Sequence, residues 1–312
     1  MIVVCGEALF DVFNDGDTGD GYALSARVGG SPFNLAIGLA RLDVPPMFFG
    51  GLSNDMFGRK LAATLEGEGV DLSCAPRPAA ATALVTVDVD AAGVPAYTLY
   101  GTATAERALA LSDLERVPGD AAAIHVGSYC MAVEPVASVT RALVARQQGR
   151  SLIAFDPNVR LTIQPERAAW TEMVAWMLPR TDLLKISDED LHHLYPNLSP
   201  QEFIAIALRA GVALVVVTRG GEGVLAATAA LAPFALPAPR IDVVDTVGAG
   251  DTFQAALLSH LSRHGLLTRA ALVALDAQAL RDALHFAGAA AALTCSRRGA
   301  DMPRLKEVPT KE

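Results

Sequence analysis

The sequence predicts an α/β protein with a mainly parallel central sheet covered by helices on both faces and a smaller β-sheet beside it. Short runs that are apolar throughout, such as VALVVVT at 212–218, alternate with helical segments along most of the 312 residues, which is typical of a buried parallel sheet. Residues 12–28 and 83–100 instead alternate polar and apolar residues, as half-exposed antiparallel strands do. We expect these two stretches to form a discontinuous β lid over the carboxyl edge of the main sheet, within a single domain spanning 1–312.

The elements follow one another in a regular order. Pro32 favours the start of the first helix, because its missing N–H would have no partner in the first turn anyway. The acidic residues that open DEDLHHLY favour a helix start through the helix dipole, and LAPFALPAP at 231–239 predicts a surface loop. Strands are expected at 1–6, 47–52, 122–128, 151–158, 182–187 and 214–221, and helices at 32–42, 57–70, 135–146, 168–178, 188–195, 201–211, from 251 onward and around 285–295.

Composition limits the classes of function. The chain is 52% hydrophobic and 19% charged, which predicts a packed core rather than disorder. Its formal net charge of -9 argues against a nucleic-acid partner. MIVVCGEALFD does not resemble a signal peptide, and no apolar run is long enough to span a membrane. The four scattered cysteines, Cys5, Cys74, Cys130 and Cys295, lack metal-ligand spacing, so we expect reduced, buried thiols in a cytoplasmic protein.

The segment DTVGAGD at 245–251 directly precedes an apolar helix. Its small residues allow the amides of Gly248, Ala249 and Gly250 to point into one concavity at a helix N-terminus, which suits a phosphate. Asp251, in the first turn, would accept a proton from a hydroxyl held opposite that phosphate. This is the geometry of phosphoryl transfer to an alcohol. Taken alone, the same residues fit a plain capped turn about as well.

Two rival nucleotide motifs are absent from the sequence. There is no GxxxxGK[ST], so the chain is not a P-loop enzyme, and CGEALFD after the first strand lacks GxGxxG. A dinucleotide-dependent dehydrogenase therefore loses its main support.

Several segments in order resemble the ribokinase (PfkB) family of carbohydrate kinases, and within it most closely the bacterial fructokinases. DTVGAGD is similar to the carboxyl-terminal signature of that family and GGSPFNLAIGLARL to its amino-terminal one. GEALFD, GGLSNDMFG, HVGS, FDPNVR, KISDEDL, TRGGEG and CSRRGAD extend the resemblance over essentially the whole chain. The resemblance implies a ribokinase-like three-layer α/β/α fold with a small β-sheet lid.

The resemblance also implies roles for residues. Asp251 is similar to the catalytic base of the family, and the amides of Gly248, Ala249 and Gly250 to its anion hole. Without the resemblance, Asp11 could be a solvated acid in a loop, and the two glycines of GGSPFN could simply form a turn. The sugar-contacting positions of the family correspond to Asp11, Gly29, Gly30 and Asn34, and Arg160 would reach substrate or phosphate oxygens with its planar donor group.

Nucleotide and metal positions follow in the same way. TRGGEG alone fits a hairpin turn, and acids in the first turn of a helix are favoured by its dipole. Ser187 and Asp190 stand where many relatives carry Asn and Glu. The resemblance assigns the nucleotide to Asn158, Lys185, Ser187, Thr218, Gly220, Gly223, Ala291 and Cys295, a water-mediated magnesium ion to Asp190 or Glu189, and a potassium ion to Asp245 and the carbonyl of Val247.

The implied activity is ATP-dependent phosphorylation of the primary hydroxyl of a free ketohexose, D-fructose to fructose 6-phosphate. The alternatives are 2-keto-3-deoxygluconate, ribose or a nucleoside as acceptor, or a non-catalytic sugar sensor on the same fold. The lid departs from the fructokinase pattern at Tyr100-Gly101 and Ala105-Glu106, which leaves the choice of sugar open. Exposed sheet faces and edges tend to be covered, and the resemblance implies a homodimer through the lid.

Overall fold

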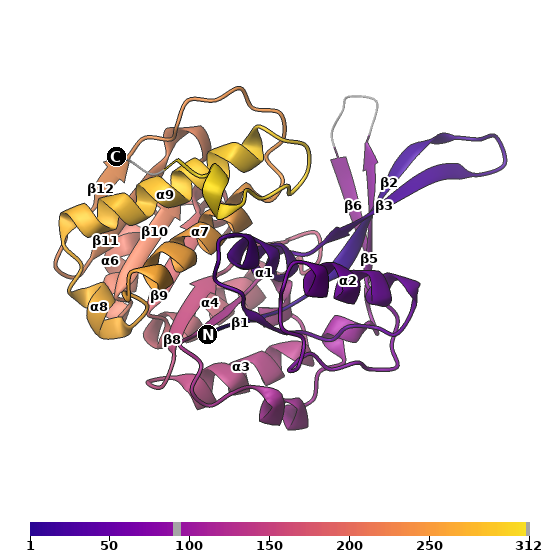
Figure 1. Ribbon diagram of the computed structural model, residues 1–312, viewed down its shortest axis with the longest axis horizontal. Helices are drawn as coiled ribbons and strands as arrows, with labels where there is room; N and C mark the ends of the chain where they lie inside the picture. Colours follow the sequence, from indigo (N-terminus) through magenta and orange to yellow (C-terminus); the bar gives the residue numbers. More distant parts are fainter. Residues whose placement is uncertain (90–94, 310–312) are drawn as a thin grey trace.

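The computed structural model describes residues 1–89 and 95–309. The predicted lid stretch 83–100 includes residues 90–94, which lie outside the described residues, as do residues 310–312 of the predicted domain. Figure 1 shows a layered body from which a smaller sheet projects.

An eight-stranded sheet forms the middle layer, in the order β12-β11-β10-β9-β8-β7-β1-β4. Neighbouring strands from β10 to β4 are parallel, whereas β11 is antiparallel to both β10 and β12. The predicted mainly parallel sheet is therefore confirmed. Its strands are β1 (Ile2–Cys5), β4 (Met47–Phe49), β7 (Ala123–Gly127), β8 (Leu152–Asp156), β9 (Leu183–Ser187), β10 (Leu214–Thr218), β11 (Val224–Thr228) and β12 (Phe234–Leu236).

Helices cover both faces of this sheet. Because successive strand residues point to opposite faces, the strands contribute to two separate apolar clusters. One cluster packs against α1, α2, α7, α8 and α9, and the other against α3, α4, α5 and α6. The helices are α1 (Ser31–Arg41), α2 (Met56–Gly67), α3 (Val136–Gln147), α4 (Arg167–Met177), α5 (Asp188–Leu194), α6 (Pro200–Ala210), α7 (Ala249–Arg263), α8 (Arg269–Val273) and α9 (Ala277–Cys295).

The expected surface loop LAPFALPAP is wrong in its middle. Residues Phe234–Leu236 form β12, which pairs antiparallel with β11 at the edge of the sheet. The flanking Pro233 and Pro237 obscure so short a strand in the sequence, although proline is tolerated at the ends of an edge strand.

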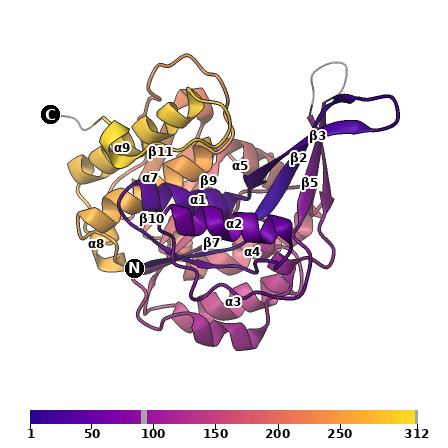
Figure 2. The same cartoon turned by 45° about the vertical axis from the view of Figure 1, so that its right-hand side comes forward.

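The smaller sheet has four strands in the order β3-β2-β5-β6 and stands out from the body in Figures 1 and 2. Its two hairpins are antiparallel, but the central pair β2 and β5 is parallel, which differs from the antiparallel pairing that the sequence predicts. Each hairpin leaves the body with its first strand and returns with its second, so the two outgoing strands run side by side. The strands are β2 (Leu9–Asp17), β3 (Tyr22–Gly29), β5 (Leu84–Val89) and β6 (Pro95–Tyr100).

Two further expectations concern membranes and thiols. Across residues 1–89 and 95–309, no helix combines the length and apolarity needed to cross a membrane. All four cysteines are free thiols; Cys5, Cys74 and Cys130 are buried as predicted, whereas Cys295 on α9 is only half-buried.

Candidate active site

The helices α1 and α7 pack side by side, and this contact creates the centre of the site (Figure 2). Ser31 and Asn34 lie in the first turn of α1, and Asp251 lies in the first turn of α7. Ser31 Oγ donates a hydrogen bond to Asp251 Oδ1 at 2.5 Å, and Asn34 Nδ2 donates to Asp251 Oδ2 at 2.9 Å. Both carboxylate oxygens are therefore held in a fixed orientation.

Burial and the neighbouring groups shift the pKa of Asp251 in opposite directions. Burial raises the pKa of Asp251, while the hydrogen bonds from Ser31 and Asn34 oppose that rise. The nearby positive charges of Lys185 and Arg160 act in the same direction as the hydrogen bonds. A carboxylate in these surroundings can accept a proton more readily than a solvated aspartate, because its charged form is less well solvated.

The glycine-rich segment forms the turn that starts α7. Gly248 caps the helix in the left-handed conformation, with φ at 77°, which a side chain would disfavour. The Ala249 N–H donates to the Thr246 carbonyl at 3.2 Å, so the turn itself uses one of the three amides assigned to the anion hole. Within residues 1–89 and 95–309, the amides of Gly248 and Gly250 have no backbone acceptor.

A buried ammonium group lies beside these amides. A Cβ at Gly250 would stand 3.2 Å from Lys185 Nζ, and Lys185 is only 3% exposed. Its Nζ forms an ion pair with Asp156 Oδ2 at 2.8 Å. Burial opposes the charge on Lys185, but the carboxylates of Asp156, Asp190 and Asp251 together outweigh it, so the pKa of Lys185 is raised and the group is a cation. A cation next to two amides at a helix N-terminus favours an anion.

The loop after β8 carries the other predicted polar groups. Asp156 Oδ1 accepts the Asn158 N–H at 3.2 Å, and Asp190 Oδ1 accepts the Val159 N–H at 3.0 Å. Asn158 adopts a φ of 41°, and its buried Nδ2 has no hydrogen-bond partner within the described part of the chain. That amide is available to a ligand oxygen.

The predicted sugar positions lie on β2, at the end of β3 and at the start of α1. A Cβ at Gly29 would lie 2.4 Å from Asp11 Oδ2, so only glycine allows this carboxylate to approach the end of β3. Gly30 has a φ of 106°, and a Cβ there would lie 2.8 Å from the Glu7 carbonyl. Burial raises the pKa of Asp11 to about 6, although the charge of Arg160 opposes the shift.

The other predicted nucleotide positions lie at the end of β9, around the end of β10 and on α9. Ser187 ends β9, and its Oγ accepts the Asp190 N–H at 3.0 Å. Thr218 ends β10, and Gly220 and Gly223 belong to the turn that joins β10 to the antiparallel β11. The hairpin reading of TRGGEG is therefore correct for its backbone. A Cβ at Gly223 would lie 2.0 Å from the Leu236 carbonyl, so packing against β12 by itself requires this glycine. Ala291 and Cys295 are half-buried on α9, and a nucleotide-binding role for any of these residues stays a prediction.

The predicted metal positions differ in their surroundings. Asp190 is 6% exposed, whereas the Glu189 side chain is 81% exposed and lies 3.8 Å from His193, away from the buried cluster. The Asp245 carboxylate accepts the Val247 N–H at 3.0 Å and the Gly299 N–H at 2.8 Å. Among the residues that the structure describes, no group of three or more His, Cys, Asp or Glu side chains forms a metal site.

Three polar residues of the site were not assigned from the sequence. Ser31 contacts Asp251 from 220 positions away, Asp156 neutralises Lys185, and Glu7, between β1 and β2, is only 2% exposed. Ser31 lies within GGSPFN, and this position is the only indication in the sequence that Ser31 belongs to the site. Burial raises the pKa of Glu7 to about 7, opposed by hydrogen bonding to Ser128.

The Glu7→Gln substitution is expected to remove a pH-dependent cost of folding. The native state holds the Glu7 proton up to about pH 7, whereas an ordinary glutamate releases it near pH 4.5. Stability therefore falls as pH rises through this window, by about 3 kcal/mol when complete. We expect urea unfolding of Glu7→Gln to show a gain at pH 8 that is absent at pH 4. Glu66→Gln, on the exposed face of α2, controls for loss of a negative charge, and an equal gain at both pH values would contradict the interpretation.

The positions at which the lid differs from the fructokinase pattern lie at the end of β6 and just after it. Tyr100 is exposed, whereas Gly101 and Ala105 are buried. Glu106 is 1% exposed, and its Oε1 accepts a hydrogen bond from Thr104 at 2.6 Å. A cavity of about 480 Å³ lies nearby, lined by Tyr97, Thr98, Leu99, Gly101, Thr102, Arg107, Thr162 and Ile163.

The chain is similar to known proteins over most of its length. A family model described as pfkB family carbohydrate kinase matches residues 1–307. A fructokinase of Rhizobium leguminosarum bv. trifolii is 36% identical over 285 residues, which cover 90% of this chain and 86% of that protein. The crystal structure of a Xylella fastidiosa fructokinase with bound ATP has a TM-score of 0.88 at 28% identity, covering 98% of this chain and 96% of that one.

A second solved structure is that of a double mutant of the Vibrio cholerae fructokinase in its fructose-, ADP- and potassium-bound form. It has a TM-score of 0.81 at 28% identity and covers 99% of this chain and 95% of that one. The fold, the signature at the start of α7 and these similarities lead to one conclusion: the chain belongs to the pfkB family of carbohydrate kinases, with the ribokinase-like fold that its sequence predicts.

Proposed function

We propose that this kinase transfers the γ-phosphoryl group of ATP to the primary hydroxyl of free D-fructose and forms fructose 6-phosphate. The observation that carries the proposal is the Asp251 carboxylate, which Ser31 and Asn34 hold at the N-terminus of α7, close to Lys185. The fructokinase relatives support fructose as the acceptor and ATP as the donor.

In the proposed reaction, Asp251 removes the proton of the fructose hydroxyl as its oxygen attacks the γ-phosphorus in line. A new oxygen–phosphorus bond forms, the bond to the bridging oxygen of ADP breaks, and the proton stays on the Asp251 carboxyl. The amides of Gly248 and Gly250, with Lys185, stabilise negative charge on the transferring oxygens. Charge stabilisation and positioning supply most of the rate enhancement.

Acceptor binding is assigned to the groups around Asp11. Its carboxylate can accept hydrogen bonds from two adjacent sugar hydroxyls. Asn34 has one N–H and its carbonyl left over after bonding Asp251, and both suit a hydroxyl. We assign Arg160 to donate to sugar or phosphate oxygens; its Nη1 donates to the Val159 carbonyl at 2.8 Å, and its other N–H groups would serve the ligand. A small sheet closing over the sugar would exclude water as a competing nucleophile.

Magnesium and potassium are proposed as the metals. Magnesium binds nucleotide phosphates with few protein ligands and keeps several waters, which agrees with the lack of a preformed acidic cluster in the described residues. Asp190 could hold it through water; when bound, the ion would neutralise charge on the phosphates. The potassium-bound form of the Vibrio relative supports the use of a monovalent ion, which we assign to Asp245 and the Val247 carbonyl.

A homodimer through the lid and a cytoplasmic location complete the proposal. Tyr22, Leu24, Tyr97 and Tyr100 of the lid strands are between 48% and 66% exposed, and a partner would cover them. Light scattering at about twice 32.6 kDa would support the dimer, and a monomer mass would oppose it. Four free thiols and the use of ATP support the cytoplasm.

The test is coupled ADP release with magnesium-ATP against fructose, glucose, mannose, ribose, 2-keto-3-deoxygluconate, adenosine and fructose 1-phosphate. We expect kcat/KM for fructose to exceed that for the other acceptors by about 10-fold or more. Preference for another acceptor would keep the chemistry and overturn fructose. Fructose binding without turnover by any acceptor would favour the sensor, and the Asp251→Asn protein is the blank for contaminating kinase activity.

A further inference from the structure

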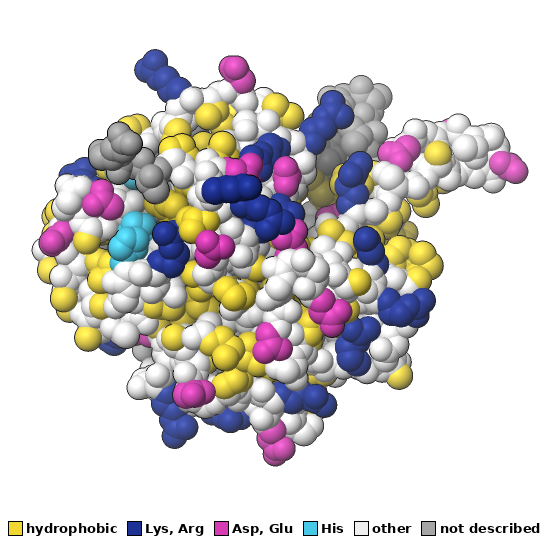
Figure 3. Space-filling model, in the orientation of Figure 1, with side chains coloured by type: hydrophobic (Ala, Val, Ile, Leu, Met, Phe, Trp, Pro, Cys, Tyr) yellow, Lys and Arg dark blue, Asp and Glu magenta, His cyan; other side chains and the backbone are white. Residues whose placement is uncertain are grey.

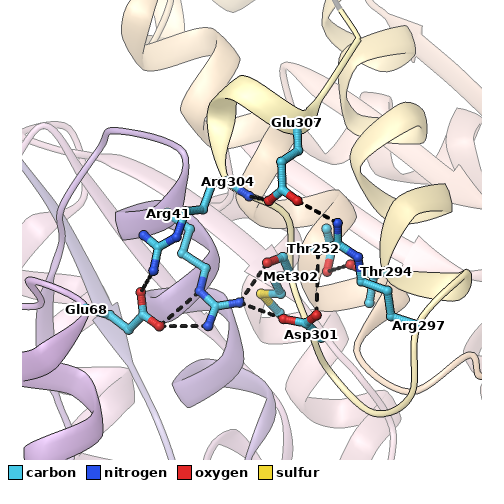
Figure 4. A network of polar contacts seen from close by, with 9 residues as sticks. All are labelled: Arg41, Glu68, Thr252, Thr294, Arg297, Asp301, Met302, Arg304 and Glu307. Atoms are coloured by element: carbon cyan, nitrogen blue, oxygen red, sulfur yellow. Dashed lines mark hydrogen bonds and ion pairs between the residues drawn. The ribbon is translucent and has the colours of Figure 1, made fainter.

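A closed ring of charged side chains joins the far end of α1 to the segment that follows α9 (Figure 4). Arg41, the last residue of α1, donates twice to Glu68 Oε1, and its Nη1 reaches Asp301 Oδ1 at 3.0 Å. Arg304 bonds the other Glu68 oxygen. Glu307 then accepts both the Arg304 backbone N–H and an Arg297 guanidinium N–H, and Arg297 returns to Asp301 at 3.6 Å. Figure 3 shows basic and acidic side chains interleaved in the middle of this face.

Within this ring, Arg41 makes the shortest hydrogen bond to the backbone of the turn at residues 297–302. Besides the two carboxylates, its Nη1 donates to the Met302 backbone carbonyl at 2.7 Å. The Arg41 side chain is 21% exposed and Glu68 15% exposed, so the pair is partly shielded from water and salt. The bond to Glu68 raises the pKa of Arg41, and the bond to Arg41 lowers the pKa of Glu68. The charged ring fixes the turn at residues 297–302 against α1.

The other side of that turn packs directly against the anion hole. A Cβ at Gly248 would lie 2.6 Å from Ala300 Cβ, so the two residues are in contact. The Gly299 N–H donates to Asp245 Oδ2 at 2.8 Å, which ties the turn to the start of DTVGAGD. Met302 is 1% exposed and fills the space between α1 and α7: a Cβ at Gly38 would meet its Sδ at 2.7 Å.

We propose that Arg41 is a positioning residue for phosphoryl transfer. It holds the turn at 297–302 against Gly248 and thereby fixes the position of the anion-hole amides relative to Asp251. The expected kinetic effect rests on the proposed function. The expected effect of Arg41 on the position of the turn does not. Arg41 touches no reacting atom; it acts through Met302, Ala300 and Gly248.

The kinetic expectation is a split between kcat and KM. The amides of the anion hole bind the transferring phosphoryl group most strongly in the transition state, while the proposed sugar contacts come from the lid and the first turn of α1. We expect Arg41→Met to lower kcat about 10-fold or more, since misplacement by about 1 Å can cost 100-fold, with KM for fructose within about 2-fold. Arg41→Lys, which can keep the Met302 carbonyl contact, is expected to recover part of kcat.

Ser259→Ala is the matched control for simple loosening of the same helix pair. The buried Ser259 Oγ donates to the Leu42 carbonyl at 2.9 Å, next to Arg41 in the chain, and within the part of the chain that the structure describes it has no hydrogen bond to residues 297–302. We expect this variant to lose stability without a change in kcat. Asp301→Asn, at a more exposed position, weakens the same ring more gently and serves if Arg41→Met does not fold.

Amide hydrogen exchange tests the inference without any turnover. The Ala249 N–H bonds the Thr246 carbonyl and the Thr252 N–H bonds the Gly248 carbonyl, so both amides report on this turn. Arg41→Met, or Asp301→Asn, should speed their exchange about 10-fold over the unaltered chain, and Ser259→Ala should not. Unchanged exchange in the Arg41 and Asp301 variants, or equal acceleration in Ser259→Ala, would overturn the positioning role. Absence of fructose turnover in the unaltered chain would instead overturn the proposed function and leave the exchange result decisive for Arg41.

Discussion

Replacing Asp251 with asparagine is expected to lower kcat by about 10³-fold or more while fructose and ATP binding stay within a few-fold. The substitution keeps the size of the side chain but removes its capacity to take a proton, and general-base catalysis contributes typically 10²–10⁴-fold. An asparagine can still accept from Ser31, but its amide would face the donating Nδ2 of Asn34. Single-turnover kinetics and calorimetric titration with fructose would separate the chemical step from binding.

The Ser31→Ala substitution should have a smaller effect than Asp251→Asn. It leaves the base in place and removes the hydrogen bond that most opposes the rise in the pKa of Asp251. The acidic limb of the kcat profile should therefore move to higher pH, with kcat at pH 8 reduced by about 10-fold or less, since the carboxylate remains. Turnover that survives in Asp251→Asn would assign the base to another group, such as the Asp11 carboxylate on β2.

Replacing Lys185 with methionine is expected to have the largest effect on stability. Lys185 and Asp156 are 3% exposed each, and they form an ion pair at 2.8 Å. Removing one partner of a buried pair leaves an uncompensated charge and costs about 3–5 kcal/mol of the free energy of unfolding. The variant should also lose turnover, because the ammonium beside Gly250 would no longer stabilise the phosphoryl oxygens.

The double variant Lys185→Met with Asp156→Asn separates these two consequences. Without a buried charge, most of the stability should return, since pairs removed together cost far less than one partner removed alone. Turnover should remain low, because the cation is still missing. Urea unfolding gives the first result and coupled ADP release the second. If the double variant were as unstable as Lys185→Met, the unpaired Asp156 charge would not be the cause.

The candidate site divides between what neighbouring residues encode and what distant packing decides. The segments DTVGAGD and TRGGEG form a turn before α7 and a hairpin after β10, because glycine conformations and helix starts depend on adjacent residues. KISDEDL shows the limit of such reasoning. Consecutive residues in a helix point in different directions, and only the packed structure buries Asp190 and exposes Glu189.

The sequence by itself determined the mainly parallel sheet, its covering helices and the family, because apolar periodicity and signature segments are local in the chain. Only the tertiary structure decided that Ser31 and Asn34 hold Asp251 and that Arg41 clamps the turn beside Gly248. These partners stand more than 200 positions apart. Their contacts arise from the packing of α1 against α7 and the final segment, and no local pattern in the chain specifies which side chains that packing brings together.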